Sequence, residues 1–190
     1  MYKQLLAAAA LAACFVAPAS ALTMESSTTH GGTVVTDYSG AGLASFDIDF
    51  ADFGPVELEF RVDDGDLFSP IAMNAILRNF TGRGFTEFSF ALDRGVFDTL
   101  GTAKPQFAGT AAVSGSGPLA TIRLSSLQYL DVEVGNALGT TPGATDWTLG
   151  GLNAGDRFTL TVSAVPEPGT YAMLLAGLAG LGLVARRRRG

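Results

Sequence analysis

The stretch VELEFRV, residues 56–62, alternates apolar and charged side chains without interruption. Successive side chains of an extended strand point to opposite faces, so the four apolar residues would share one face and the three charged residues the other. A period of two therefore predicts a strand with one buried face and one face in water. The fold class of the whole chain depends on how often this pattern occurs elsewhere.

The same alternation returns several times between residues 22 and 164. It predicts strands at 45–53, 71–80, 86–92, 119–124, 130–134, 145–149 and 157–164, with a short helix as the alternative at 71–80. Together with 56–62 these runs amount to about eight short strands, and no amphipathic helical pattern separates them. We therefore predict an all-β domain, an antiparallel β-sandwich whose strands could follow a jelly-roll order.

The segments between these runs lead to three further predictions. Gly54-Pro55 predicts a hairpin turn between the strands on either side of it. The polar residues 22–32 indicate a loose arm, and residues 101–117, rich in Gly, Ala, Ser and Thr, indicate a long loop with at most one short strand.

Composition excludes several classes of function. The chain of 190 residues has a formal charge of −6, and residues 22–164 hold 17 acidic against 7 basic side chains, a net −10. We expect no nucleic-acid partner, because a general binder needs a basic surface facing the phosphates. A single Cys and a single His exclude an internal disulfide, a multi-cysteine zinc site and a multi-histidine metal centre within one chain.

The first 21 residues have the pattern of a secretory signal. Lys3 provides the positive start, residues 5–16 an apolar run that predicts a signal helix, and Ala19 and Ala21 the small residues that signal peptidase accepts. Cleavage after Ala21 would begin the mature chain at Leu22. Leu11-Ala12-Ala13-Cys14 also resembles the lipobox of bacterial lipoproteins, so lipidation of Cys14 stays open as an alternative.

The C-terminal residues form three consecutive parts. Two prolines within VPEPGT, residues 165–170, make a stiff extended segment that cannot join the interior of a strand or helix. An apolar stretch at 171–185 predicts a transmembrane helix of about 22 Å, short against about 30 Å of hydrocarbon and hence a weak anchor. Four arginines follow, Arg186, Arg187, Arg188 and Arg189, and would hold the C-terminus in the cytoplasm.

This tail resembles the PEP-CTERM sorting signal of Gram-negative bacteria, through Val165, Pro166, Glu167, Pro168 and Thr170 followed by the apolar span and the arginines. The resemblance implies recognition by an exosortase, a membrane-embedded protease that would process the tail near the motif. The protein would then pass from the inner membrane to the cell surface or the extracellular matrix. A simple single-span anchor behind a proline-rich stalk is the alternative.

Candidate chemistry is confined to acidic side chains. Asp63, Asp64 and Asp66 flank a glycine and could bind Ca²⁺, although the spacing is not that of an EF-hand and a solvated turn explains the same residues. Ca²⁺ is the only cofactor that the sequence suggests.

Asp47, Asp49 and Asp52 form a second acidic set, with Asp47 and Asp49 on one strand face. Paired carboxylates could serve glycoside hydrolysis, and the solvent face of an edge strand is the alternative that we favour. Trp147, the only tryptophan, could stack on a sugar, and a core position is the favoured alternative.

These features predict a non-enzymatic surface or matrix protein, linked to exopolysaccharide or biofilm and delivered by signal peptidase and an exosortase. A carbohydrate-binding module, with Ca²⁺ assistance from the Asp63 turn, is the first alternative. A secreted hydrolase that acts through carboxylates is the second.

Overall fold

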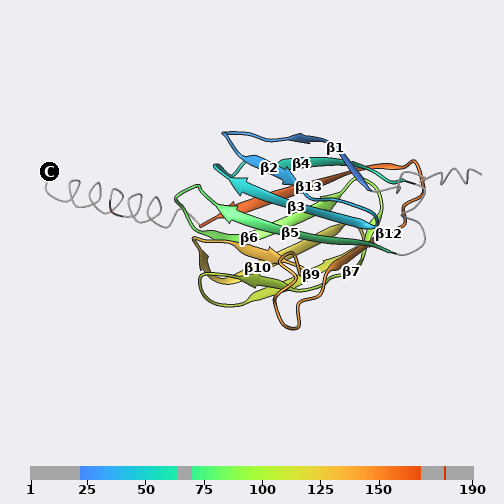
Figure 1. The fold of residues 1–190 in the computed structure, drawn as a ribbon. Coiled ribbons are helices and arrows are strands. Elements are labelled where there is room, and N and C mark those ends of the chain that lie inside the picture. Colours follow the sequence, from blue (N-terminus) through green and yellow to red (C-terminus); the bar gives the residue numbers. More distant parts are fainter. Residues whose placement is uncertain (1–21, 64–69, 168–177, 179–190) are drawn as a thin grey trace, which may run out of the picture.

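The computed structural model describes residues 22–63, 70–167 and Leu178, and within them the chain forms thirteen strands in two sheets (Figure 1). The predicted signal helix at 1–21 lies outside these residues, as does the predicted transmembrane helix at 171–185 apart from Leu178. One sheet, here called sheet A, has the strand order β1 (Thr23–Thr28), β4 (Val56–Arg61), β13 (Arg157–Pro166), β6 (Phe85–Leu92), β10 (Leu119–Gln128) and β9 (Ala111–Ser116).

The second sheet, sheet B, divides at its long central strand. Its strand order is β2 (Val34–Asp37), β3 (Leu43–Phe50), β5 (Ile71–Asn79), β11 (Val132–Val134) and β8 (Ala103–Pro105). The first half of β5 pairs instead with β12 (Trp147–Gly150), which in turn pairs with β7 (Val96–Thr99). One edge of β5 thus holds two different partner strands.

The prediction that all strands pair antiparallel is wrong at the centre of sheet B, where β3 and β5 are parallel. The predicted hairpin at Gly54-Pro55 is wrong for the same reason. The chain leaves β3 in sheet B, forms β4 in sheet A and returns to sheet B as β5. A parallel pair needs such a crossover, and here a strand of the opposite sheet provides it in place of a helix.

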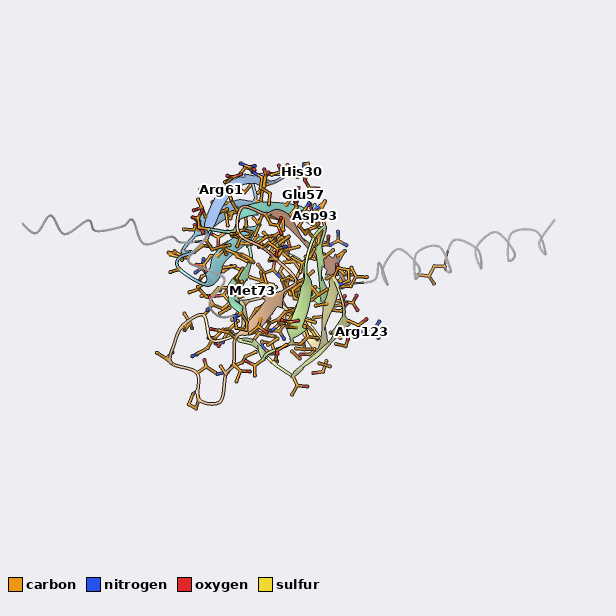
Figure 2. All side chains as sticks on the ribbon, turned by 90° about the vertical axis from the view of Figure 1, so that its right-hand side faces the viewer. His30, Glu57, Arg61, Met73, Asp93 and Arg123 are labelled. Carbon is orange, nitrogen blue, oxygen red and sulfur yellow. The ribbon has the colours of Figure 1, made fainter. Side chains whose placement is uncertain are left out.

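The two sheets pack face to face around one core, which is the layered arrangement of a sandwich. Phe46 of β3 contacts Phe60 of β4 with ring centroids 6.3 Å apart, and Phe50 of β3 contacts Phe85 of β6 at 5.6 Å. Such aromatic pairs add about 1 kcal/mol each to the gain from burial. Met73 lies inside, whereas Arg123 points outward from sheet A (Figure 2).

Three short strands lie where the sequence predicts loops. Residues 22–32 contain β1, which pairs with β4, and residues 101–117 contain β8 and β9. Most side chains of β1 and of β9 are exposed, although Met24, Ala111 and Val113 are half-buried against the core. These strands depend on backbone hydrogen bonds to a neighbour, so their side chains carry no apolar alternation for the sequence to display.

One carboxylate fastens β1 to sheet A. Glu25 accepts hydrogen bonds from Arg157 of β13 at 2.6 and 3.1 Å and from Arg61 of β4 at 3.0 Å. The hydrogen bond from Arg157 is the largest cause of the lowered pKa of the Glu25 carboxyl. A lowered pKa in the folded state means that this carboxylate adds stability above its unfolded pKa and that the gain is lost as the pH falls through the folded pKa.

We expect Glu25→Gln to lower the melting temperature at neutral pH, because the charged partner of both arginines is removed. The difference from the unchanged protein should disappear in acid, where Glu25 is itself protonated. Thermal unfolding followed by circular dichroism over a pH series measures this. Glu57→Gln is the control, because Glu57 lies on the same face of β4 as Arg61 but is not bonded to Glu25, Arg61 or Arg157. A difference that persists at low pH would contradict the assignment.

Candidate functional site

The last strand of sheet A carries the first half of the sorting motif. Val165 and Pro166 are the final residues of β13 and pair with β6. The next residue, Glu167, donates its backbone N–H to the carbonyl oxygen of Gly84 at 3.0 Å. The hydroxyl of Thr86 lies 3.2 Å from the carbonyl oxygen of Val165 and 3.3 Å from that of Pro166. The motif is therefore anchored on the folded domain as far as Glu167.

Proline is compatible with this position because it ends the strand. Pro166 has no N–H to donate, and a strand tolerates it only at an end, an edge or a bulge. The register of β13 against β6 shifts between Val165 and Pro166, which marks such an irregularity. The remaining residues of the predicted sorting and processing sites lie outside the described part of the chain: Ala19, Ala21, Pro168, Thr170, Arg186, Arg187, Arg188 and Arg189.

Only one member of the predicted Ca²⁺ turn can be placed. Asp63 lies 2.8 Å from the guanidinium of Arg61 and 3.4 Å from the hydroxyl of Thr23, whereas Asp64 and Asp66 lie outside the described residues. Among residues 22–63 and 70–167, no three His, Cys, Asp or Glu side chains are grouped to hold a metal. The Ca²⁺ site stays a prediction.

A second cluster of charge lies on the outer face of sheet B. Arg78 of β5 contacts Asp47 of β3 at 2.6 Å and Asp49 of β3 at 2.9 Å. The Asp47 side chain is only 9% exposed, and that of Arg78 is 30% exposed. The parallel pairing of β3 with β5 places Asp49 directly opposite Arg78. Asp52, the third predicted member, instead accepts a hydrogen bond from the backbone N–H of Gly54 in the turn after β3.

These contacts affect the ionisation of the cluster. The pKa of the Arg78 guanidinium is raised, first by its hydrogen bond with Asp49 and then by that with Asp47. The pKa of Asp131, whose carboxylate lies 3.9 Å from Arg78, is raised by burial. Arg78 is thus a permanent cation between carboxylates, and it holds the two β3 side chains in one orientation.

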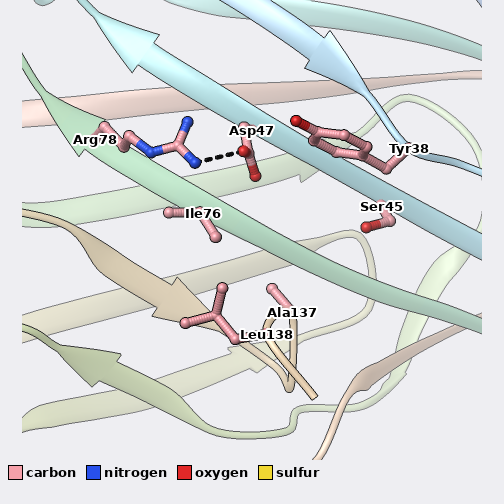
Figure 3. Close-up of a pocket in the computed structure, with 7 residues that line it drawn as sticks. All are labelled: Tyr38, Ser45, Asp47, Ile76, Arg78, Ala137 and Leu138. Atoms are coloured by element: carbon pink, nitrogen blue, oxygen red, sulfur yellow. Dashed lines mark hydrogen bonds and ion pairs between the residues drawn. The ribbon is translucent and has the colours of Figure 1, made fainter. Parts of the chain in front are cut away.

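A groove of about 430 Å³ runs along this face (Figure 3). Its lining combines one aromatic, two charged, one hydroxyl and three aliphatic side chains: Tyr38, Asp47, Arg78, Ser45, Ile76, Ala137 and Leu138. Tyr38 follows β2, and Leu138 belongs to the loop after β11; they are 59% and 53% exposed. An exposed ring beside immobilised polar groups is an arrangement that can bind a small, partly apolar ligand.

Hydrogen bonds hold the groove in shape. Ser45 donates to Asn74 at 2.7 Å, and the amide of Asn74 donates to Asp146 at 3.2 Å. Under the wall formed by Leu138, Glu133 accepts from the N–H of Leu138 at 3.2 Å and from the hydroxyl of Thr141 at 2.8 Å. The groove therefore exists before any ligand arrives.

The sequence pattern singled out Asp47, which lines the groove, and its neighbour Asp49, but not the other lining residues. Arg78 was the available signal, because a lone cation interrupts an otherwise apolar and amide-bearing strand. Trp147 plays no part in it: the indole is fully buried against Phe90 and Phe97, and its N–H donates to the carbonyl oxygen of Thr102 at 3.1 Å. The favoured core position of Trp147 is confirmed.

The fold and its last strand define an all-β domain that runs directly into a C-terminal targeting segment. A family model described as the PEP-CTERM protein-sorting motif matches residues 164–189. The chain therefore carries a PEP-CTERM sorting motif, as its resemblance predicted, and this supports an exported protein that an exosortase sorts. Searches of curated proteins and of solved structures found no match.

Across the part of the chain that the structure describes, no helix is long and apolar enough to cross a bilayer.

We expect Arg78→Met to destabilise the domain by about 2 kcal/mol, because it leaves the nearly buried Asp47 carboxylate without its cation. Adding Asp47→Asn should restore part of the loss, since the uncompensated charge is then removed as well. The control is Arg123→Met, whose ion pair with Glu87 is 75% exposed on the arginine side and should be worth at most about 1 kcal/mol. Urea unfolding measures all three, and equal effects of Arg78→Met and Arg123→Met would contradict the assignment.

Proposed function

We propose that this chain is an exported, non-enzymatic protein of the cell surface or extracellular matrix, linked to exopolysaccharide and processed by an exosortase. The observation that carries the proposal is the PEP-CTERM motif at residues 164–189. Signal peptidase would remove the N-terminal segment, the inner membrane would hold the tail, and the exosortase would act near Pro166, Glu167 and Pro168. The acidic domain, net −10 over residues 22–164, is then the part that is delivered.

The attachment of the motif to the domain supports this order of events. Since Glu167 is hydrogen-bonded to Gly84, the domain reaches as far as the motif and leaves no linker before it. A protease binds its substrate as an extended segment, and the residues before Glu167 are paired in sheet A, so cleavage beyond Glu167 would leave that pairing in place. The domain would therefore still be folded when it is released from the membrane.

Replacement of the motif glutamate tests the sorting. We expect Glu167→Ala, in the producing bacterium, to leave unprocessed protein in the inner-membrane fraction, because the exosortase loses a charged recognition group. Glu57→Ala, an equal change on the solvent face of sheet A, should be processed normally. Cell fractionation and immunoblotting give the readout. Normal surface delivery of Glu167→Ala would count against exosortase sorting.

A second candidate function is saccharide binding in the groove of sheet B. Tyr38 offers an exposed ring on which a sugar can stack, and Ser45, Asp47 and Arg78 offer hydrogen-bonding groups beside it. Arg78 is outnumbered by Asp47, Asp49 and Asp131 around it. This acidic surrounding favours neutral sugars over sugar acids, since an anionic ligand would be repelled.

A hydrolase at the same place is less well supported. Glycoside hydrolysis needs one carboxyl group that holds a proton and a second that is ionised. Asp47 and Asp49 are both bonded to the same guanidinium, Asp47 through Oδ2 and Asp49 through Oδ1, so both carboxyl groups are engaged by the one cation. We therefore keep the proposal non-enzymatic.

We expect Tyr38→Ala to weaken binding of a neutral oligosaccharide about tenfold, which corresponds to about 1.4 kcal/mol. The matched control is Tyr129→Ala, because Tyr129 is also exposed, at 43%, but does not line the groove. A glycan array identifies the oligosaccharide and calorimetry measures the affinities. If both tyrosine variants lose affinity equally, or if no glycan binds, the groove is not a saccharide site.

A further inference from the structure

Four large apolar side chains are exposed at the end of the domain where β13 finishes. They are Phe80, Phe107, Tyr129 and Leu130, at 65%, 57%, 43% and 51% exposure, and are called here the apolar rim. Phe80 directly follows β5, and Phe107 lies two residues after the end of β8. Tyr129 and Leu130 directly follow β10. The last residues of β10 and β13 both pair with Phe85 at the start of β6, so these loops share one end of the domain (Figure 1).

Hydrogen bonds hold the rim loops together. The amide of Asn79 donates to the carbonyl oxygens of Arg83 at 2.7 Å and of Gln128 at 2.9 Å. The fully buried side chain of Gln128 in turn accepts from the N–H of Phe107 at 3.2 Å. The rings of Phe107 and Tyr129 meet edge to face with centroids 5.9 Å apart. These contacts fix the positions of the loops, so the rings of the rim are exposed in a defined arrangement.

The sorting motif leaves the domain beside this rim. A Cβ atom placed on Gly84 would lie 3.2 Å from Cζ of Tyr129, so the tyrosine ring covers Gly84. The carbonyl oxygen of the same glycine accepts the N–H of Glu167. Gly84 therefore contacts both features: its carbonyl oxygen binds Glu167 of the motif, and its α-carbon lies under Tyr129 of the rim.

The sequence limits how far this end can be from a membrane. The apolar stretch of the tail begins at Tyr171, and a fully extended chain spans at most about 14 Å between the Cα atoms of Glu167 and Tyr171. If the tail enters the bilayer, as the proposed function requires, the Cα atom of Glu167 is within about that distance of the apolar stretch, and the rim lies beside Glu167 across Gly84. Exposed apolar patches of this kind mark contact surfaces, and aromatic residues favour the membrane–water interface.

We propose that the apolar rim docks into the headgroup region of the inner membrane around the exit of the sorting signal. In the docked domain this end faces the membrane while the motif is processed. Charge at this end is mixed: Arg83, in the loop after Phe80, is exposed and lies 5.6 Å from the ring of Phe53, whereas Asp131, 44% exposed, directly follows Leu130. Anionic headgroups attract that cation, whereas they repel the rest of a domain with net charge −10.

The test uses the full chain with Cys14→Ser, reconstituted into vesicles of phosphatidylethanolamine and phosphatidylglycerol. One environment-sensitive fluorophore is attached at Gln106→Cys, next to the rim, or at Ser116→Cys in the β9–β10 hairpin. Both positions are exposed, and the hairpin lies at the opposite end of β10. We expect nitroxide-labelled headgroups to quench the probe at 106 and shift its emission to the blue, with neither effect at 116.

Further variants assign the effect to the rim. Tyr129→Ser with Leu130→Ser should remove the quenching at 106, whereas Leu119→Ser, an equally exposed apolar residue in the hairpin, should leave it. A chain that floats with the vesicles while its probe at 106 stays unquenched overturns the docking alone. Quenching that needs a co-reconstituted exosortase assigns the rim to the enzyme and overturns membrane docking. A chain that fails to float with the vesicles overturns the anchoring in the proposed function.

Discussion

The pairing of β13 on both of its edges is the constraint on which the domain depends. It joins β4 on one side and β6 on the other, so without it sheet A would separate into β1–β4 and β6–β10–β9. Its alternate residues, Phe158, Leu160, Val162 and Ala164, are buried in the common core. Because the same strand ends in Val165 and Pro166, the stability of the fold and the position of the sorting motif are coupled.

The crossover of β4 into sheet A has a comparable effect on sheet B. It brings β3 and β5 together as parallel neighbours, and the register sets Asp49 opposite Arg78. The guanidinium then neutralises two carboxylates of an acidic domain and fixes the floor of the groove. A hairpin between β3 and β4 would have left these carboxylates in water beside the glutamates of β4, with like charges on adjacent strands.

Sequence patterns located the strands whose side chains alternate between core and water, including β4, β6 and β13. They failed for β1, β2, β8 and β9, because a strand with little buried surface is held by the backbone of its neighbour and needs no apolar period. They also missed β7, whose four residues include one buried side chain, too few to show a period. They also failed for the turn after Phe53, since Gly and Pro end a strand equally well before a hairpin and before a change of sheet. The local sequence therefore predicts which side chains are buried better than it predicts which strands pair.

By itself the sequence determined the acidic character of the domain, its β class and the PEP-CTERM motif, because charge, side-chain period and a linear signal are read along consecutive residues. Only the tertiary structure decided the groove and the apolar rim. The groove joins Tyr38, Arg78 and Leu138, and the rim joins Phe80, Phe107 and Tyr129, from loops and strands far apart in the chain. Their proximity follows from strand order and from which sheet each strand enters, and neither property is encoded in any one segment.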